Sequence, residues 1–377
     1  MRAVAAARSG QIATLVLPAD VSWSDGAALA APRPSLSTST IDHSQVSTAA
    51  HVSSAGPPAM LLLGGNALTE RGLRAASRIS AATGARLLAE TFPARMERGA
   101  GVPGVDRLAY LAELAEAQLA GVSHLILAGA RAPVSFFAYP GRASDLVPAD
   151  CSVTVLADSD QDVETALEAL AGQVAPETRP VLTELASPPP AEPGPLTAIS
   201  LANTIAASLP EGAIVSDEAN TSGFALPMAL TGAARHSLLT LTGGSIGQGL
   251  PAATGAAIAA PDRPVLCLEA DGSAMYTISA LWTHAREGLD ITTVIFANGS
   301  YAILDLESQR LGVPAGGSAH HDLLDLTRPG LDFIALARGM GVPASRATTT
   351  EDFTDQLRRA FAESGPHLIE AAVPPLF

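Results

Sequence analysis

Residues 269–274 read Glu-Ala-Asp-Gly-Ser-Ala, and residues 296–301 read Phe-Ala-Asn-Gly-Ser-Tyr. Each stretch follows a run of apolar residues of the length that is typical of a buried strand. A helix-like segment connects the two, which predicts a β-α-β unit with two parallel strands. The carboxyl ends of such strands lie side by side, so we expect Asp271 and Asn298 to converge on one point.

This point of convergence has the chemistry of a cation and phosphate site. A carboxylate and an amide oxygen are hard ligands of the kind that divalent cations prefer. The amides of Gly272 and Ser273 open the connecting helix, and the first turn of a helix favours anions such as phosphate. For an Asp-Gly pair taken alone, the alternative is an ordinary strand-turn-helix in which Asp271 caps the helix. The residue types together predict a cofactor site.

The composition restricts the classes of protein to which the chain can belong. With 377 residues, of which 47% are hydrophobic and 16% charged, the chain is long enough for about two or three packed domains. The net charge of −15 argues against nucleic acid as a partner. All 22 basic residues are arginine, and the absence of lysine excludes Schiff-base chemistry and a phosphate-loop lysine. No apolar run reaches membrane-spanning length and no signal sequence opens the chain, so we expect a cytoplasmic protein that does not contact a membrane.

Alternating strand-like and helix-like segments predict an α/β fold with two doubly wound parallel-sheet domains. The central domain is expected over residues 57–173, with an amphipathic helix at 70–83. The C-terminal domain, which contains both quoted stretches, is expected over residues 196–377. Residues 24–56 and 174–195 are rich in Ser, Thr, Pro or Glu and are interpreted as linkers.

A glycine-rich segment in the C-terminal domain gives a second signal. Residues 242–251 read Thr-Gly-Gly-Ser-Ile-Gly-Gln-Gly-Leu-Pro, with one bulky residue, Ile246, among the glycines. Glycine lets the backbone adopt positive φ and approach a flat ligand closely. A glycine-rich helix entry made for packing is the alternative for this segment by itself.

Together the two segments resemble the cofactor motif of thiamine-diphosphate-dependent enzymes, which reads Gly-Asp-Gly and then, after a helix, Asn-Asn. This chain reads Ala-Asp-Gly at 270–272 and Ala-Asn at 297–298, so it departs at the first glycine and the first asparagine. Neither departure removes a ligand. The resemblance implies that Mg²⁺ is bound by Asp271, Asn298 and the main-chain carbonyl of Ser300.

The resemblance also implies which residues bind thiamine diphosphate. In the family a glycine carbonyl accepts a hydrogen bond from the aminopyrimidine ring, and a large aliphatic residue holds the cofactor in a bent conformation. These roles fall on Gly244 and Ile246. Residues 216–222 follow the first strand of the domain as a polar loop, in which Asn220 and Thr221 are candidates to reach the diphosphate. The alternative is a loop that caps the next helix. The full implied set is Asn220, Thr221, Gly244, Ser245, Ile246, Asp271, Gly272, Ser273, Asn298, Ser300 and Tyr301.

From residue 58 onward the chain looks like the acetolactate synthase and benzoylformate decarboxylase group of this family. Residues 1–23, with a strand-like run at 12–18, resemble the tail of the family's N-terminal pyrimidine-binding domain, and most of that domain has no counterpart here. In the family a glutamate of that domain activates the cofactor. Glu218 and Glu269 belong to the diphosphate-binding domain and cannot replace it, so the catalytic residue is unknown.

The resemblance implies a Mg²⁺- and thiamine-diphosphate-dependent 2-oxo acid decarboxylase or carboligase that is similar to acetolactate synthase. The chain would hold half of an active site, completed in a homo-oligomer or by a partner subunit that carries the pyrimidine domain. The alternative is a truncated or non-catalytic homologue that binds cofactor weakly or acts as a regulatory subunit. The turn Gly64-Gly65-Asn66 suggests FAD or a nicotinamide cofactor, but it lacks the full glycine pattern and a well-placed acidic residue, so FAD is unsupported. The particular 2-oxo acid is not identified by the sequence.

Overall fold

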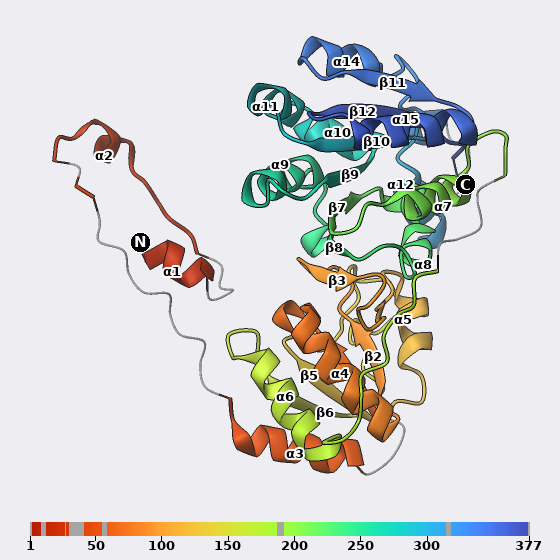
Figure 1. The fold of residues 1–377 in the computed structure, drawn as a ribbon. Coiled ribbons are helices and arrows are strands. Elements are labelled where there is room, and N and C mark those ends of the chain that lie inside the picture. The colour runs from red at the N-terminus through yellow and green to blue at the C-terminus, as the bar shows by residue number, and fades with distance from the viewer. Residues whose placement is uncertain are drawn as a thin grey trace. The chain divides into compact units, whose positions relative to one another are not determined.

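The computed structural model describes residues 2–8, 13–26, 28–29, 41–54, 59–186, 192–313 and 318–375. Its contacts divide the chain into two compact units, each built around its own sheet (Figure 1). The first unit takes the chain up to Glu90 together with residues 108–136 and 145–180. The second unit comprises residues 91–107, 137–144 and 181–377.

The first sheet has five strands within the described residues, in the order β4-β2-β1-β5-β6, and all of them except the edge strand β4 belong to the first unit. β1 pairs in parallel with β2 and β5, and β5 pairs in parallel with β6. All residues of β1 are buried, as expected of a central strand that is covered on both faces. The strands are β1 (Ala59–Leu63), β2 (Arg86–Ala89), β4 (Asp106–Arg107), β5 (His124–Ala128) and β6 (Ser152–Ala157).

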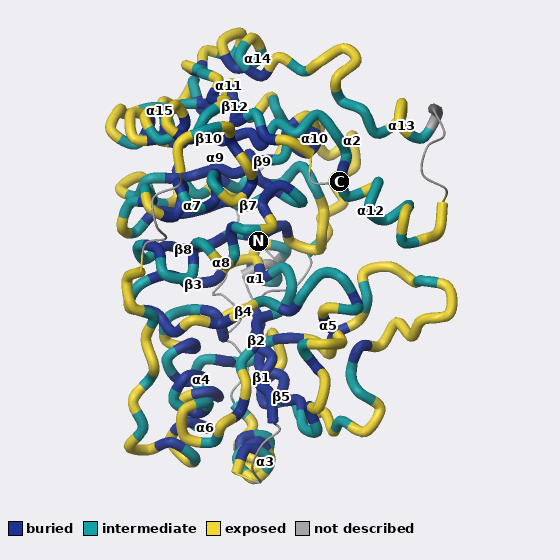
Figure 2. The backbone as a smooth tube through the Cα atoms, turned by 90° about the vertical axis from the view of Figure 1, so that its right-hand side faces the viewer, coloured by how far each residue is buried: buried dark blue, intermediate teal, exposed yellow. Residues whose placement is uncertain are grey.

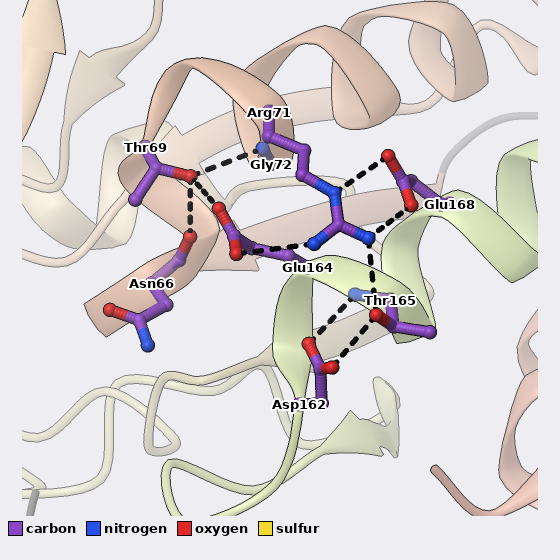
Figure 3. Close-up of polar contacts among 8 residues, drawn as sticks. All are labelled: Asn66, Thr69, Arg71, Gly72, Asp162, Glu164, Thr165 and Glu168. Carbon is purple, nitrogen blue, oxygen red and sulfur yellow. Dashed lines mark hydrogen bonds and ion pairs between the residues drawn. The ribbon is translucent and has the colours of Figure 1, made fainter. Parts of the chain in front are cut away.

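Helices cover both faces of this sheet (Figure 1). α5 (Ala112–Leu119) packs against the face that includes Met60 and Leu62 of β1. α4 (Glu70–Thr83) and α6 (Val163–Val174) pack against each other. Arg71 of α4 donates to Glu168 and Thr165 of α6 (Figure 3). The observed bounds of α4 are those expected from the sequence.

Part of the expected linker at 24–56 is a packed helix, so that expectation is wrong for residues 43–54. α3 (His43–Ser54) contacts α6 and β6 and buries Val46, Ala49 and Ser53. The composition rich in Ser and Thr is compatible with a helix because these hydroxyl groups donate to main-chain carbonyls one turn earlier. Ser47 bonds to His43 in this way, and Ser53 bonds to Ala49.

The N-terminal strand expected at 12–18 is also wrong where the structure describes it. Residues 13–18 are not a strand, and residue 12 lies outside the described residues. Leu15, Val16 and Leu17 are exposed, and an apolar run without a paired neighbouring strand does not make a stable sheet. The two helices of this region are α1 (Arg2–Arg8) and α2 (Ala19–Trp23).

The second unit contains, within the described residues, a seven-stranded sheet in the order β11-β12-β10-β9-β7-β8-β3. Its strand pairs are parallel, except for the antiparallel pair of β3 and β8 at one edge. The strands are β3 (Met96–Arg98), β7 (Ala213–Glu218), β8 (His236–Leu239), β9 (Val265–Ala270), β10 (Ile291–Ala297), β11 (Ala344–Ala347) and β12 (His367–Ala372).

Helices lie on both faces of this second sheet as well. α9 (Gly249–Ala259), α10 (Asp271–Thr277), α11 (Ala280–Glu287) and α14 (Phe333–Gly339) share one apolar core with β9 and β10. α7 (Ala198–Ser208) and α15 (Thr350–Ala362) pack together, and α15 contacts β10, β11 and β12. Figure 2 shows β7, β9 and β10 as buried. The predicted α/β class with two parallel sheets is therefore confirmed.

The remaining elements connect these layers. They are α8 (Leu226–Ala229), α12 (Ala302–Arg310), α13 (Ser318–Leu324) and the short turns η1 (Gly65–Leu68), η2 (Asn220–Gly223) and η3 (Thr242–Gly244).

Within the second expected linker, Thr183 exchanges main-chain hydrogen bonds with Gly101 and Val102, so this part of the linker is fixed to the second unit. No helix in the described part of the chain is long and apolar enough to cross a membrane.

Val46→Asp is expected to destabilise the first unit, because it places a carboxylate in the contact of α3 with α6 and β6. Lost apolar burial and the cost of burying a charge predict a decrease in unfolding free energy of about 3 kcal/mol or more. Ser47→Asp, on the exposed side of the same helix, is the control and should cost less than about 0.5 kcal/mol. Urea unfolding followed by circular dichroism measures both variants. Equal stability of the two would show that α3 does not pack.

Candidate cofactor site

The structure brings Asp271 and Asn298 together at the carboxyl edge of the second sheet. β9 ends at Ala270, where α10 begins, and β10 ends at Ala297. The two strands pair in parallel with Phe296 opposite Ala270, so both polar side chains follow the strand ends directly. The amide of Gly299, one residue beyond Asn298, donates to Oδ2 of Asp271 at 2.7 Å.

The carboxylate of Asp271 is buried, with 3% of the residue exposed. Its Oδ1 accepts a second hydrogen bond, at 2.8 Å, from the amide of Gly272. Burial raises the pKa of Asp271, whereas the amides of Gly299 and Gly272 oppose this by stabilising the charged form. A divalent cation at this carboxylate would stabilise its ionised form further.

Side chains that follow three neighbouring strands are connected at this edge. Asn298 donates from Nδ2 to the hydroxyl of Ser222 at 2.9 Å, and its Oδ1 accepts from the amide of Ser300 at 2.8 Å. Asn220, which follows β7, donates to the hydroxyl of Ser273 at 2.7 Å. The ends of β7, β9 and β10 therefore converge on one polar cluster.

The turn after β7 contains a residue that the sequence analysis missed. Ser222 is 1% exposed and is the hydroxyl that contacts Asn298, whereas the predicted Thr221 is half-buried. Asn220 has a φ of 50°, a left-handed conformation that asparagine tolerates better than most residues. The polar composition of the loop indicates that hydroxyl groups gather here, but its sequence does not indicate which of them contacts Asn298.

The oxygen atoms of this cluster fit a hard cation. Among the described residues no group of three or more His, Cys, Asp or Glu side chains is placed to hold a metal. The predicted metal ligands do not need such a group of side chains, since they are the carboxylate of Asp271, the amide oxygen of Asn298 and the main-chain carbonyl of Ser300. An all-oxygen set with few carboxylates suits Mg²⁺, which retains several ligands from water or phosphate.

Tyr301 lies against Gly272 at the start of α10. A Cβ atom at Gly272 would lie 2.4 Å from Cε1 of the Tyr301 ring, so this contact requires glycine. The backbone between Asn298 and Tyr301 turns at Gly299, which has a φ of 71°. The predicted residues at both strand ends therefore pack directly against each other.

The glycine-rich segment forms a turn with the backbone conformations expected of glycine. Gly243, Gly244 and Gly247 have φ values of 68°, 69° and 94°. Gly244 and Ser245 are exposed, and Ile246 is half-buried. The main chain at Gly244 is thus accessible to a ligand, with the aliphatic side chain of Ile246 two residues further on.

Two acidic residues near this turn have no counterpart among the predicted site residues. β7 extends to Glu218, although the sequence predicted a strand only as far as Val215 and a loop after it. Asp217 and Glu218 line a cavity of about 120 Å³ together with Arg107, Asn220, Phe224 and Leu241. Burial raises the pKa of Asp217, and the nearby Arg107 and Arg98 oppose this. The signal for these residues was two consecutive acids after an apolar run, which also fits an exposed loop.

His284 has a structural role in the core. It is 0% exposed, and its Nε2 lies 2.7 Å from the hydroxyl of Thr254 on α9. Burial lowers the pKa of His284 to about 4, so the ring is neutral near pH 7.

The glycine turn after β1 does not offer an open phosphate site. The carboxylate of Glu90 accepts from the amide of Gly65 at 3.2 Å. Thr69 caps α4 by accepting from Gly72, and its hydroxyl donates to Glu164 (Figure 3). The amide of Gly65 is therefore bonded within the chain, to an acid that directly follows β2. These contacts do not support FAD or a nicotinamide cofactor at this turn.

Comparisons with known proteins find similarity in both sequence and fold. The family model described as "Thiamine pyrophosphate enzyme, C-terminal TPP binding domain" matches residues 220–371. A putative acetolactate synthase large subunit, IlvX, of Mycobacterium tuberculosis is 60% identical, and the match covers 99% of this chain and 72% of that protein. Benzoylformate decarboxylase of Pseudomonas aeruginosa is 38% identical over 55% of this chain and 39% of its own length.

The solved structures include similar folds. The thiamine diphosphate-dependent 4-hydroxybenzoylformate decarboxylase of Rhodococcus jostii RHA1 matches with a TM-score of 0.73 and 26% identity. This match covers 91% of the present chain and 66% of the decarboxylase. These three matches cover 72%, 39% and 66% of the length of the respective relatives.

Gly272→Ala is expected to lower the unfolding free energy by about 1–3 kcal/mol, because the added methyl group overlaps the ring of Tyr301. In a Tyr301→Ala background the same substitution should cost almost nothing, since the ring is gone. Gly255→Ala is the control: it lies within α9 with open space around it, so it should be neutral or slightly stabilising. Urea unfolding of the four variants measures this coupling. An equal cost in both backgrounds would show that Tyr301 does not restrict this position.

His284→Gln is expected to reduce the loss of stability on acidification. The unfolded histidine has its ordinary pKa near 6.5 and the folded one has a pKa of about 4. Between these values only the unfolded chain binds the proton, so wild-type stability falls as the pH decreases from about 6.5 to about 4. Over this range the variant should lose up to about 3 kcal/mol less than the wild type. Urea unfolding at a series of pH values measures the difference, with the exposed His51→Gln as control. Parallel curves for wild type and His284→Gln would contradict the assignment.

Proposed function

The chain belongs to the thiamine pyrophosphate-dependent family of acetolactate synthases and 2-oxo acid decarboxylases, and we propose that it provides the Mg²⁺- and diphosphate-binding half of such an active site. The reaction would be decarboxylation of a 2-oxo acid, followed by protonation or by transfer to an acceptor carbonyl as in acetolactate synthesis. The observation that supports this most directly is the contact of the Asp271 carboxylate with the Gly299 amide, which brings two strand ends to one point.

Asp271, Asn298 and the carbonyl of Ser300 would hold Mg²⁺. Asp271 is already oriented by two amides, so its oxygens need no rearrangement to bind a cation. Asn298 is held from its other end by Ser222. Its amide oxygen would exchange the hydrogen bond from Ser300 for the metal. The metal would then link the chain to the diphosphate, as hard cations commonly do.

The diphosphate would be held by polar groups around the same cluster. Asn220 and Ser273 already form a hydrogen bond with each other across the ends of β7 and β9. Thr221 lies between Asn220 and Ser222 in the same turn. The amide of Gly272 and the main chain at Tyr301 complete the proposed set on the other side of the cation.

The glycine-rich turn would bind the ring end of the cofactor. When bound, thiamine diphosphate supplies a thiazolium carbon that attacks the 2-oxo acid and accepts the electron pair left by carbon dioxide. The exposed carbonyl of Gly244 would accept a hydrogen bond from the aminopyrimidine, and Ser245 lies beside it. Ile246 would support the bent conformation of the cofactor through its aliphatic side chain.

We assign the proton transfer on the cofactor to none of the described residues of this site. In our proposal this requires a glutamate of a pyrimidine-binding domain, which we expect to be supplied by a partner subunit. We further propose a cytoplasmic location, in keeping with a 2-oxo acid as the substrate. The alternative, a non-catalytic homologue that retains cofactor binding, is distinguished by the experiment below.

Asp271→Ala is expected to weaken Mg²⁺-dependent binding of thiamine diphosphate by about 100-fold or more, because it removes the one carboxylate of the metal site. Asp262→Ala removes an exposed acid before β9 and should leave binding unchanged. Isothermal titration of the chain with the cofactor, with and without Mg²⁺, measures both. Equal affinity of the two variants would refute the metal assignment, and absence of binding to the wild type would refute the cofactor.

The catalytic part of the proposal is measured by pyruvate decarboxylation with and without a separately expressed pyrimidine-binding domain. We expect activity only when that domain is present. Activity of the chain alone would refute the half-site. Tight cofactor binding without activity in the presence of the domain would identify the non-catalytic homologue.

A further inference from the structure

Glu218 ends β7 beneath the glycine-rich turn and is 1% exposed. Its carboxylate accepts hydrogen bonds from two residues of the turn, Gly247 and Gly249. The bond from the Gly249 amide is 2.5 Å long. Both oxygens are used, because Gly247 bonds to Oε1 and Gly249 to Oε2. One side chain therefore satisfies two main-chain donors that are separated by a single residue.

Ser216 of β7 and Glu269 of β9 also lie against the glycine-rich turn, at Gly249. Ser216 of β7 donates from its hydroxyl to the carbonyl of Gly249 at 3.0 Å, so both polar groups of Gly249 bond to β7. Glu269 of β9 lies opposite Glu218 in the parallel register and is also 1% exposed. A Cβ atom at Gly249 would lie 2.0 Å from Oε1 of Glu269, so the close approach of the turn to these carboxylates requires glycine.

The other hydrogen bonds of the turn connect it to residues close in the sequence: Gln248 donates to Thr240 and Thr242, and the amide of Gly244 donates to the carbonyl of Leu241. Three of its glycines adopt positive φ, and glycine has the largest conformational freedom to lose on ordering. Gly243 and Gly244 are exposed. The two residues proposed to contact the cofactor ring, Gly244 and Ile246, lie three residues and one residue before Gly247. An anchor at Gly247 therefore determines where they point.

We propose that Glu218 is a positioning residue for the ring-binding half of the cofactor site: it holds the glycine-rich turn through the amides of Gly247 and Gly249 and so places Gly244 and Ile246. This inference rests on the proposed function, because it assigns a role to those two residues. Glu218 itself contacts the turn and not the reacting atoms. The metal residues Asp271 and Asn298 follow β9 and β10, and their hydrogen bonds to Gly299 and Ser222 do not involve Glu218.

Binding of the ring end and of the diphosphate end of the cofactor can be measured separately. Glu218→Gln replaces one carboxylate oxygen by an NH₂ group, which cannot accept from a glycine amide and leaves a buried donor unpaired. Thiamine diphosphate should bind at least tenfold more weakly to the variant. Inorganic pyrophosphate with Mg²⁺ carries the diphosphate group but no rings, so its affinity should change less than twofold. Isothermal titration of the full chain with both ligands measures this split.

A second measurement needs no cofactor. Hydrogen exchange of the amides of residues 247–249 should be at least tenfold faster in Glu218→Gln, because their acceptor is impaired. Glu218→Asp keeps both oxygens and should recover part of the protection. Glu370→Gln is the matched control. Glu370 is a buried glutamate in β12 of the same sheet and pairs with Arg346, so its loss affects stability without affecting the turn.

The outcomes distinguish the two proposals. Failure of the wild type to bind thiamine diphosphate refutes the proposed function. Binding by the wild type with unchanged affinity in Glu218→Gln refutes the positioning role. Equal weakening of both ligands in Glu218→Gln also refutes it, since a general loss of structure would affect pyrophosphate as well. If Glu370→Gln shows the same split between ligands as Glu218→Gln, the effect is not specific to the turn and the inference is wrong.

Discussion

The parallel, in-register pairing of β7, β9 and β10 is the constraint on which the whole site depends. Glu218 lies opposite Glu269, and Ala270 lies opposite Phe296, so the three strands end at the same edge of the sheet. Polar residues that are distant in the sequence then meet without any long or unusual loop. A shift of one residue in this register would turn the side chains at the strand ends to the other face of the sheet. The apolar cores on both faces oppose such a shift and in this way hold the geometry of the polar cluster.

The same arrangement places several buried carboxylates at the edge of the sheet. They differ in the hydrogen bonds that offset the energetic cost of burying them. Two glycine amides bond to Glu218, and burial still raises its pKa. Burial and the charge of Glu218 raise the pKa of Glu269 well above its ordinary value, which favours a neutral, protonated side chain. Asp271 is held by the amides of Gly272 and Gly299. Buried acids contribute little to stability. The presence of several acids beside two glycine-containing turns is therefore better explained by a role in positioning the main chain and a cation.

The sequence was sufficient where a local pattern decides the structure. Short apolar runs that end in Asp271 and Asn298 predicted two adjacent parallel strands, because the β-α-β rule leaves little choice of topology. The glycines of 243–247 predicted positive φ for the same kind of reason. The sequence was insufficient where contacts with residues distant in the chain determine the structure. Glu218 is a strand residue because β7 pairs with β9 as far as Glu269, and its side chain is buried under the amides of Gly247 and Gly249. α3 is a helix because α6 and β6 cover its apolar side. Neither contact is visible in the residues themselves.

The division of the site into a metal half and a ring half follows from these contacts. Asp271 and Asn298 are fixed by their positions at strand ends and by hydrogen bonds to Gly299 and Ser222, which follow neighbouring strands, so the cation-binding geometry belongs to the sheet. Gly244 and Ile246 are fixed through a turn whose glycines favour no single conformation, so their geometry depends on the side chain to which the turn is bonded. The bonds that attach this turn to β7 come from the side chains of Glu218 and Ser216, and Glu218 alone reaches Gly247, the glycine next to Ile246. Loss of Glu218 would therefore leave a chain that still binds the diphosphate but no longer orients the rings, and orientation of the reacting groups is the larger part of what a cofactor site contributes to catalysis.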